Sequence, residues 1–166
     1  MAATNSIDLE SDPRAIIGSR VFDAPRELVF AAFTDPKLLA QWWGPNGFTT
    51  TTISFDFRAG GVWRFVMHGP DGRDYQNRVT YEEIVPPERL VYRHTGGEDV
   101  EPVKFVQRLT FEDLGSGKTR LTWHGTFPSA DERARVIKEY GADKGLVETM
   151  ARLADYVASQ AAGGAR

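Results

Sequence analysis

The chain has 166 residues, a length at which one domain with a substantial hydrophobic core is expected. Its 20 basic and 23 acidic residues give a net charge of -3, so neither a nucleic acid nor an anionic membrane surface is expected as a partner. The sequence contains no cysteine, which excludes disulfides, thiolate metal ligands and a cysteine nucleophile.

The N-terminal segment contains acidic residues and lacks the apolar run of a secretory signal. No window of 18 apolar residues occurs in the sequence, because charges interrupt even the richest segment, 145–157. A cytoplasmic protein is therefore expected.

The first predicted element is a strand at 15–22, where β-branched residues end at Asp23-Ala24-Pro25. A short helix follows, with Asp23 or Ala24 as its cap and Pro25 in its first turn. Asp35-Pro36 repeats this start signal, and Gly44-Pro45 stops the second helix. Two short helices are expected after the first strand, and residues 1–14 are expected to form a flexible tail.

Between residues 49 and 127 the apolar pattern has a period of two, which predicts antiparallel strands joined by tight turns. In the strand at 62–68 this period places Trp63, Phe65 and Met67 inward and Arg64 and Val66 outward. The next strand, at 74–85, loses its phase near residues 82–83, which indicates a bulge. A last hairpin joins 103–113 to 119–127, giving six or seven strands in all.

The C-terminal part is predicted to be a long helix that starts at a capping box formed by Ser129 and Glu132 and is interrupted in its first half at Gly141 and Gly145. Apolar residues recur at steps of three and four after residue 145, so one helix face must be buried. Residues 159–166 are expected to fray. The sequence thus predicts a single α+β domain over residues 15–158, with a curved sheet around the long helix.

Sequence motifs for metal and nucleotide binding are missing. The histidines at 68, 94 and 124 lie on three different predicted strands without close ligand spacing, so no metal site is expected. Gly117-Lys118-Thr119 resembles the end of a phosphate-binding loop, but Glu112 stands where that motif needs glycine. No cofactor is expected.

The aromatic content suggests a ligand cavity, because the sequence has 4 Trp, 5 Tyr and 10 Phe and many of these fall on the inner face of the sheet. These rings either fill the core or line a space that one helix cannot fill. Tyr92, His94 and Gln107 share the inner parity and are either satisfied core groups or specificity contacts. The candidate ligand-binding residues are Trp43, Trp63, Phe65, Met67, Tyr81, Tyr92, His94, Gln107, Leu109, Trp123, Val147, Met150 and Leu153.

The order of predicted elements is a strand, two short helices, a run of antiparallel strands and a long C-terminal helix. This order and several local motifs resemble the helix-grip superfamily called SRPBCC, which includes START domains and the birch pollen allergen. The closer resemblance is to the branch named for the C-terminal domain of the activator of heat-shock protein 90 ATPase. The matching segments are Ala24-Pro25, Trp42-Trp43-Gly44-Pro45, Gly60-Gly61 before Trp63-Arg64-Phe65, Met67 followed by Gly69-Pro70-Asp71-Gly72, Pro86-Pro87-Glu88-Arg89-Leu90, and the helix at 145–154.

The resemblance implies a helix-grip fold with a deep cavity between the sheet and the long helix, but it does not define one function. The first hypothesis is that the cavity binds a hydrophobic or aromatic small molecule. The second is a co-chaperone or stress-response partner of a chaperone ATPase, although the activator's N-terminal domain has no counterpart in this sequence. The third is a cyclase-like or hydrolase-like enzyme in which Tyr92, His94 or Asp56 carries protons; no catalytic residue can be assigned from the resemblance.

Overall fold

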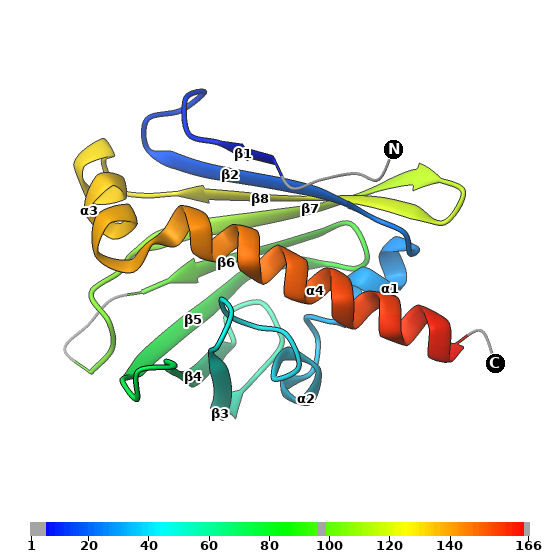
Figure 1. Ribbon diagram of the computed structural model, residues 1–166, viewed down its shortest axis with the longest axis horizontal. Coiled ribbons are helices and arrows are strands. Elements are labelled where there is room, and N and C mark those ends of the chain that lie inside the picture. The colour runs from blue at the N-terminus through cyan, green and yellow to red at the C-terminus, as the bar shows by residue number, and fades with distance from the viewer. Residues whose placement is uncertain (1–5, 96–98, 165–166) are drawn as a thin grey trace.

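The computed structural model describes residues 6–95 and 99–164, which form one antiparallel sheet with a long helix across its face (Figure 1). The strands are β1 Ser6–Asp8, β2 Ala15–Phe22, β3 Thr49–Phe55, β4 Val62–His68, β5 Asp74–Val85, β6 Arg89–His94, β7 Phe105–Gly115 and β8 Lys118–Thr126. The helices are α1 Arg26–Ala31, α2 Pro36–Leu39, α3 Ala130–Tyr140 and α4 Ala142–Gly164.

The order of strands in the sheet is β1-β2-β8-β7-β6-β5-β4-β3, and every neighbouring pair is antiparallel. From β3 to β8 each strand pairs with the next one in the chain, as short turns allow. The pairing of β2 with β8 brings the N-terminal part of the chain beside the last strand. This α+β arrangement agrees with the predicted helix-grip class.

The core lies between the sheet and the middle part of α4. Met150 and Leu153 are fully buried and Val157 is 1% exposed, which matches their spacing along one helix face. They join the inward side chains of the strands and of α1 and α2 in one cluster. The other large members of this cluster are Phe22, Phe30, Phe33, Leu39, Trp42, Trp63, Phe65, Tyr81, Leu90, Tyr92, Leu109, Phe111, Leu121 and Trp123.

The structure corrects three boundaries of the prediction. The described residues contain eight strands rather than six or seven, because Ser6–Asp8 pair with β2 inside the expected N-terminal tail. The interruption expected at Gly141 is a complete break into two helices, since Gly141 adopts a left-handed conformation with φ of 62° and ends α3. In addition, α4 extends beyond residue 158 to Gly164.

Most local start and turn signals act as predicted. The Asp35 side chain accepts a hydrogen bond from the Lys37 amide at the start of α2, and Ser129 accepts one from the Glu132 amide at the start of α3. The β5–β6 register shifts between Tyr81 and Glu83, which confirms the bulge. At α1 the prediction was wrong, because Pro25 is itself the N-cap residue and no side chain caps the helix.

The strand β4 follows the predicted alternation with one exception. Trp63 and Phe65 are each 1% exposed and Arg64 is partly exposed, but Val66, predicted to point outward, is only 9% exposed. Its side chain lies between the register positions of Thr51 and Gln76 on the two flanking strands. Within residues 6–95 and 99–164, no helix is both long and apolar enough to cross a membrane.

Candidate functional site: a cavity between the sheet and the helices

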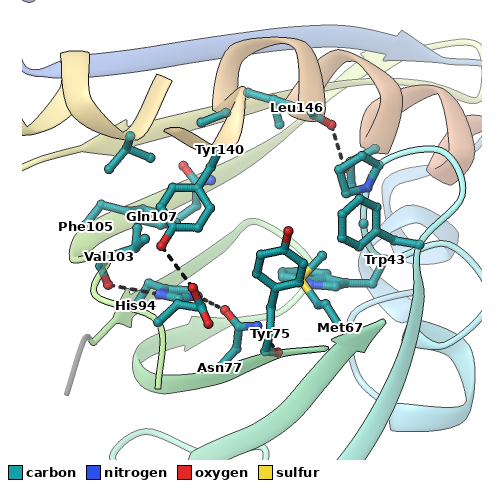
Figure 2. Close-up of a pocket in the computed structure, with 18 of the residues that line it drawn as sticks. Trp43, Met67, Tyr75, Asn77, His94, Val103, Phe105, Gln107, Tyr140 and Leu146 are labelled. Carbon is teal, nitrogen blue, oxygen red and sulfur yellow. Dashed lines mark hydrogen bonds between the residues drawn. The ribbon is translucent and has the colours of Figure 1, made fainter. Parts of the chain in front are cut away.

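A cavity of about 320 Å³ opens between the inner face of the sheet and the junction of α3 and α4 (Figure 2). Its walls come from β4 to β8, from the first turns of α4, from α3, and from the loops that follow α2 and β6. The lining residues are Trp43, Gly44, Pro45, Phe48, Phe65, Met67, Tyr75, Asn77, Tyr92, His94, Glu101, Val103, Phe105, Gln107, Trp123, Val136, Glu139, Tyr140, Ala142, Gly145, Leu146 and Thr149.

Strand register explains why the sheet contributes these particular side chains. Phe65 pairs with Asn77 and Met67 with Tyr75 across β4 and β5, and Tyr92 pairs with Gln107 across β6 and β7. Residues that pair directly across antiparallel strands point to the same face. The sheet therefore presents a patch of mixed aromatic and polar side chains beneath the helices.

The apolar end of the cavity is built by the loop after α2. Trp43 from this loop packs edge-on against Phe65, with ring centroids 5.8 Å apart, and lies beside Met67 in Figure 2. Arg152 of α4 holds the loop, because its Nη1 donates to the carbonyl oxygens of Gly44, Pro45 and Phe48 at 2.9, 3.0 and 3.1 Å. Burial lowers the pKa of Arg152, but its role here is to donate hydrogen bonds.

The opposite end of the cavity holds a buried histidine. His94 Nε2 lies 2.8 Å from Asn77 Oδ1, and Nδ1 lies 3.3 Å from the Val103 carbonyl oxygen. Burial lowers the pKa of His94 to about 4, so the ring is neutral near pH 7 and carries one N–H, which the shorter contact places on Nε2. The ring also stacks on Phe105, at 5.1 Å between centroids. His94 is thus a fixed, uncharged part of the wall.

Gln107 and Tyr92 form a second polar pair in the wall. The Tyr92 phenol accepts a hydrogen bond from Gln107, and burial raises the pKa of Tyr92 well above its usual value, so the phenol is neutral. Gln107 is 9% exposed, and its Oε1 has no hydrogen-bond partner among the described residues. A buried acceptor without a donor is uncommon in a folded protein.

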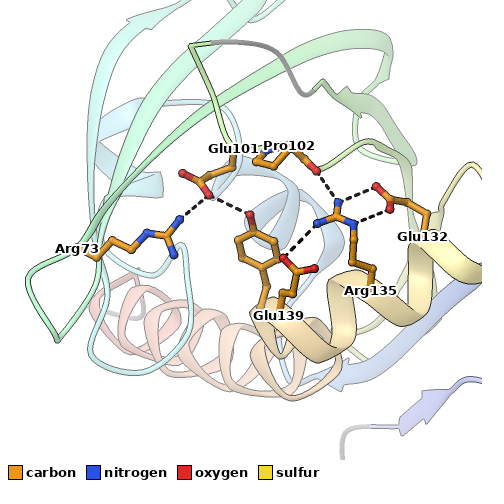
Figure 3. A network of polar contacts seen from close by, with 7 residues as sticks. Arg73, Glu101, Pro102, Glu132, Arg135 and Glu139 are labelled. Carbon is orange, nitrogen blue, oxygen red and sulfur yellow. Dashed lines mark hydrogen bonds and ion pairs between the residues drawn. The ribbon is translucent and has the colours of Figure 1, made fainter.

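A network of charged groups includes the lining residues Glu101 and Glu139 (Figure 3). Glu101 Oε1 lies 2.9 Å from Arg73 Nη2 and accepts a hydrogen bond of 3.0 Å from the Tyr140 hydroxyl. Arg135 of α3 donates to the Pro102 carbonyl at 2.6 Å and contacts the carboxylates of Glu132 and Glu139. These contacts tie α3 to the loop after β6.

The structure divides the predicted site residues into two groups. The predicted residues that line the cavity are Trp43, Phe65, Met67, Tyr92, His94, Gln107 and Trp123. The predicted residues that lie in the packed core instead are Trp63, Tyr81, Leu109, Met150 and Leu153. Val147 is partly buried and does not line the cavity, so the prediction of a floor formed by Val147, Met150 and Leu153 was wrong.

The error on α4 has a simple geometric cause. The helix touches the sheet closely at Met150 and Leu153, which leaves no space there, and the cavity lies nearer its N-terminus. There the helix presents Gly145, Leu146 and Thr149. The small residues of the first turns, together with the break at Gly141, leave the space that the cavity occupies.

Other lining residues were missed by the sequence prediction. Tyr75 and Asn77 share the inward parity of Val79, so extending the period of two toward the start of the strand would have identified them. Glu101 and Tyr140 come from a loop and from the end of a helix, where no repeating pattern marks a lining position.

Asp56, named in the enzyme hypothesis, does not line the cavity. Its carboxylate is half exposed and pairs with Arg58 at 2.7 Å. Across residues 6–95 and 99–164, no three histidine, aspartate or glutamate side chains come close enough together to hold a metal ion.

Comparison with known families identifies the family of this chain. The family model described as "Activator of Hsp90 ATPase homolog 1-like protein" matches residues 23–158, which is most of the chain. The chain belongs to this family. The family lies in the SRPBCC superfamily, so the resemblance seen in the sequence is confirmed. No curated protein matches the chain.

Solved structures share the fold of this activator-like chain. A protein from Arthrobacter aurescens is 25% identical, with a TM-score of 0.84 over 93% of this chain and 91% of that one. A Nitrosomonas europaea protein is 23% identical, with a TM-score of 0.80 over 92% and 99% of the two chains. A Silicibacter pomeroyi protein described as AHSA1 is 23% identical, with a TM-score of 0.68 over 88% and 99%. At these identities the likeness supports the fold and leaves function to the site.

Proposed function

We propose that this protein binds a mainly apolar, ring-containing small molecule in the cavity between the sheet and the α3–α4 junction. The observation that carries the proposal is the cavity of about 320 Å³ itself, which lies beside a tightly packed core. Protein interiors are close-packed, and ligand pockets are typically mostly apolar spaces of roughly 300–1,000 Å³ with a few placed polar groups.

The lining supports an aromatic or hydrophobic ligand. Trp43, Phe48 and Phe65 supply ring surfaces, and two buried polar groups that the sheet contributes, His94 and Tyr92, are neutral near pH 7. An apolar body can enter such a space without stripping water from a charge on the sheet. Polar atoms at one end then orient the ligand.

Filling the cavity from α4 tests the proposal. A Cβ added at Gly145 would meet only Pro45 Cγ, at 3.3 Å, so Gly145→Leu introduces a side chain where the ligand is expected to lie. Leucine also has the better helix propensity, by up to about 1 kcal/mol, so the variant is expected to fold. Ala158→Leu, at an exposed position on the same helix, is the matched control.

The measurement is a fluorescence titration with N-phenylnaphthylamine, an uncharged probe whose emission rises in apolar surroundings. We expect saturable binding to the wild type and to Ala158→Leu, and an affinity at least about tenfold lower for Gly145→Leu. Equal binding to all three proteins would place the probe outside the cavity, and no binding to the wild type would contradict the proposed function.

A further inference from the structure

The charged side chains among the described residues of the cavity lining are acidic. Among the described residues that line the cavity, Glu101 and Glu139 are the acidic ones, and no lysine or arginine is present. His94 adds no positive charge, because burial lowers its pKa to about 4. A ligand in the cavity therefore faces carboxylates and neutral groups.

Glu101 is the more enclosed of the two acids. Its side chain is 17% exposed, whereas that of Glu139 is 53% exposed at the rim. A charge contact that is partly shielded from water is stronger and less screened by salt than one at the surface. Glu101 is thus the residue with most influence on the charge that the cavity accepts.

The cations that pair with these acids lie outside the lining. Arg73 contacts Glu101, and Arg135 contacts Glu139, but neither arginine lines the cavity. Lys104, whose charge acts on Glu132, is also absent from the lining. In Figure 3 Arg73 lies beside Glu101 and Arg135 lies beside Glu139, on separate sides of the network.

Aromatic rings surround the acidic end. Tyr75 and Tyr140 both line the cavity, with ring centroids 6.4 Å apart, and Phe48 lies 5.8 Å from Tyr75. The Arg73 guanidinium lies 4.2 Å from the centre of the Tyr75 ring, so this ring already interacts with a cation. Ring faces attract organic cations and have no such attraction for anions.

An independent observation concerns Gln107. Its side chain lines the cavity and is 9% exposed, and its Oε1 lacks a hydrogen-bond donor among the described residues. Oε1 is fully buried beside Gly125, so a donor on a ligand would reach this acceptor only after the amide turns toward the cavity. Carboxylates and phosphates provide only acceptors at neutral pH, whereas amines provide N–H donors.

We propose that the ligand is an organic amine: an apolar or aromatic body that carries a protonated nitrogen directed toward Glu101. This inference rests on the proposed function and specifies its ligand class. The apolar body lies toward Trp43, Met67 and Leu146, and the ammonium group lies at the end that holds His94, Asn77 and Tyr140 (Figure 2). Hydrophobic acids of the same shape are disfavoured.

The test uses three probes of one shape: naphthylethylamine, naphthylethanol and naphthylacetate, each competing with bound N-phenylnaphthylamine at neutral pH and low salt. We expect the amine to bind the wild type about tenfold more tightly than the acid, with the alcohol between them. Glu101→Gln should reduce the amine-to-acid ratio to about twofold or less while leaving alcohol binding nearly unchanged.

Two further variants test whether the amine-to-acid affinity ratio follows the charge near Glu101. Arg73→Gln removes the cation that pairs with Glu101 and should raise the preference for the amine. Glu88→Gln, which removes an exposed acid outside the cavity, should leave the ratio unchanged. Thermal melting of each variant confirms that the proteins compared are folded.

The possible failures are distinguishable. If the alcohol displaces N-phenylnaphthylamine but the acid binds as tightly as the amine, the cationic ligand class is wrong and the proposed function stands. The same holds if Glu101→Gln keeps the wild-type ratio. If N-phenylnaphthylamine does not bind the wild type, the proposed function fails and this inference fails with it.

Discussion

At the scale of single residues, His94 makes the stability of the fold depend on pH. Its pKa is about 4 in the folded protein, because of burial, against 6.5 for a free histidine. Between these values the unfolded state binds the proton and the folded state does not, so the free energy of unfolding falls as the pH is lowered. This stabilisation is complete above about pH 6.5 and is lost on the way down to about pH 4.

We therefore expect His94 to contribute roughly 2 kcal/mol to the loss of stability between pH 8 and pH 5. Urea unfolding at both pH values measures it. The His94→Gln variant should lose less stability than the wild type over this range, while His124→Gln, on the outer face of β8, should behave like the wild type. Equal pH dependence in the wild type and His94→Gln would show that the ring is not the buried neutral group described above.

Arg152 is a second residue whose effect reaches the cavity. One guanidinium nitrogen bonds three carbonyl oxygens of the loop that carries Trp43. Arg152→Met keeps an unbranched apolar stem and removes these bonds, leaving the carbonyl oxygens to find other donors. We expect a loss of about 2 kcal/mol in the free energy of unfolding and weaker binding of N-phenylnaphthylamine.

The control for this prediction is Arg108→Met, an exposed arginine on β7 away from the cavity. Urea denaturation and probe titration should show little change in this variant. If Arg152→Met and Arg108→Met have equal stability and equal probe affinity, the loop does not depend on the guanidinium.

At the scale of elements, the close approach of β2 to α4 depends on Gly18. A Cβ built at Gly18 would lie 2.6 Å from Leu146 Cδ2 and 3.3 Å from Met150 Cε. Gly18→Val is therefore expected to lower the free energy of unfolding by about 1–3 kcal/mol, because the added methyl groups displace Leu146 toward the cavity or push the helix away.

Combining Gly18→Val with Leu146→Ala tests the contact itself, since the second change makes room for the first. The double variant should be more stable than the sum of the two single effects predicts. Ser19→Val, at the adjacent outward position, should be tolerated. Simple additivity in thermal or urea unfolding would mean that the two side chains do not compete for the same space.

The sheet was predictable from the sequence because the alternation of inward and outward side chains depends only on neighbouring residues in each strand. A period of two gave the shared face of Phe65 and Met67 and of Tyr92 and His94, and all four line the cavity. Turn and cap residues acted through the same local physics, as at Ser129. Tyr75 lay within reach of the same rule.

The cavity was less predictable because its position depends on contacts between distant elements. The apolar stripe on α4 indicates which side faces the sheet, but not that Met150 is packed tightly while Leu146 borders a space. Glu101 and Tyr140 meet across 39 positions of sequence, in a contact that no periodic pattern encodes. The strand β1 is three residues long, too short for its alternation to be recognised.

At the scale of the whole molecule, α4 has two roles along its length. Its middle part packs against the sheet through Met150, Leu153 and Val157, and its first turns leave the cavity open. The rigid core therefore supports a site that needs no large rearrangement to exist. The tightly packed core and the cavity therefore lie at different positions along α4, and ligand binding is expected at the cavity end.

The four tryptophans provide the most direct test of this account, because two line the cavity and two do not. Trp43 and Trp123 are lining residues, whereas Trp42 and Trp63 are buried, with their indole N–H groups bonded to Ala32 and Thr52. Proton–nitrogen NMR of isotope-labelled protein resolves one indole signal for each tryptophan. On titration with N-phenylnaphthylamine, the signals of Trp43 and Trp123 should shift most, and saturably. No saturable shift, or the largest shifts at Trp42 and Trp63, would contradict binding in the cavity.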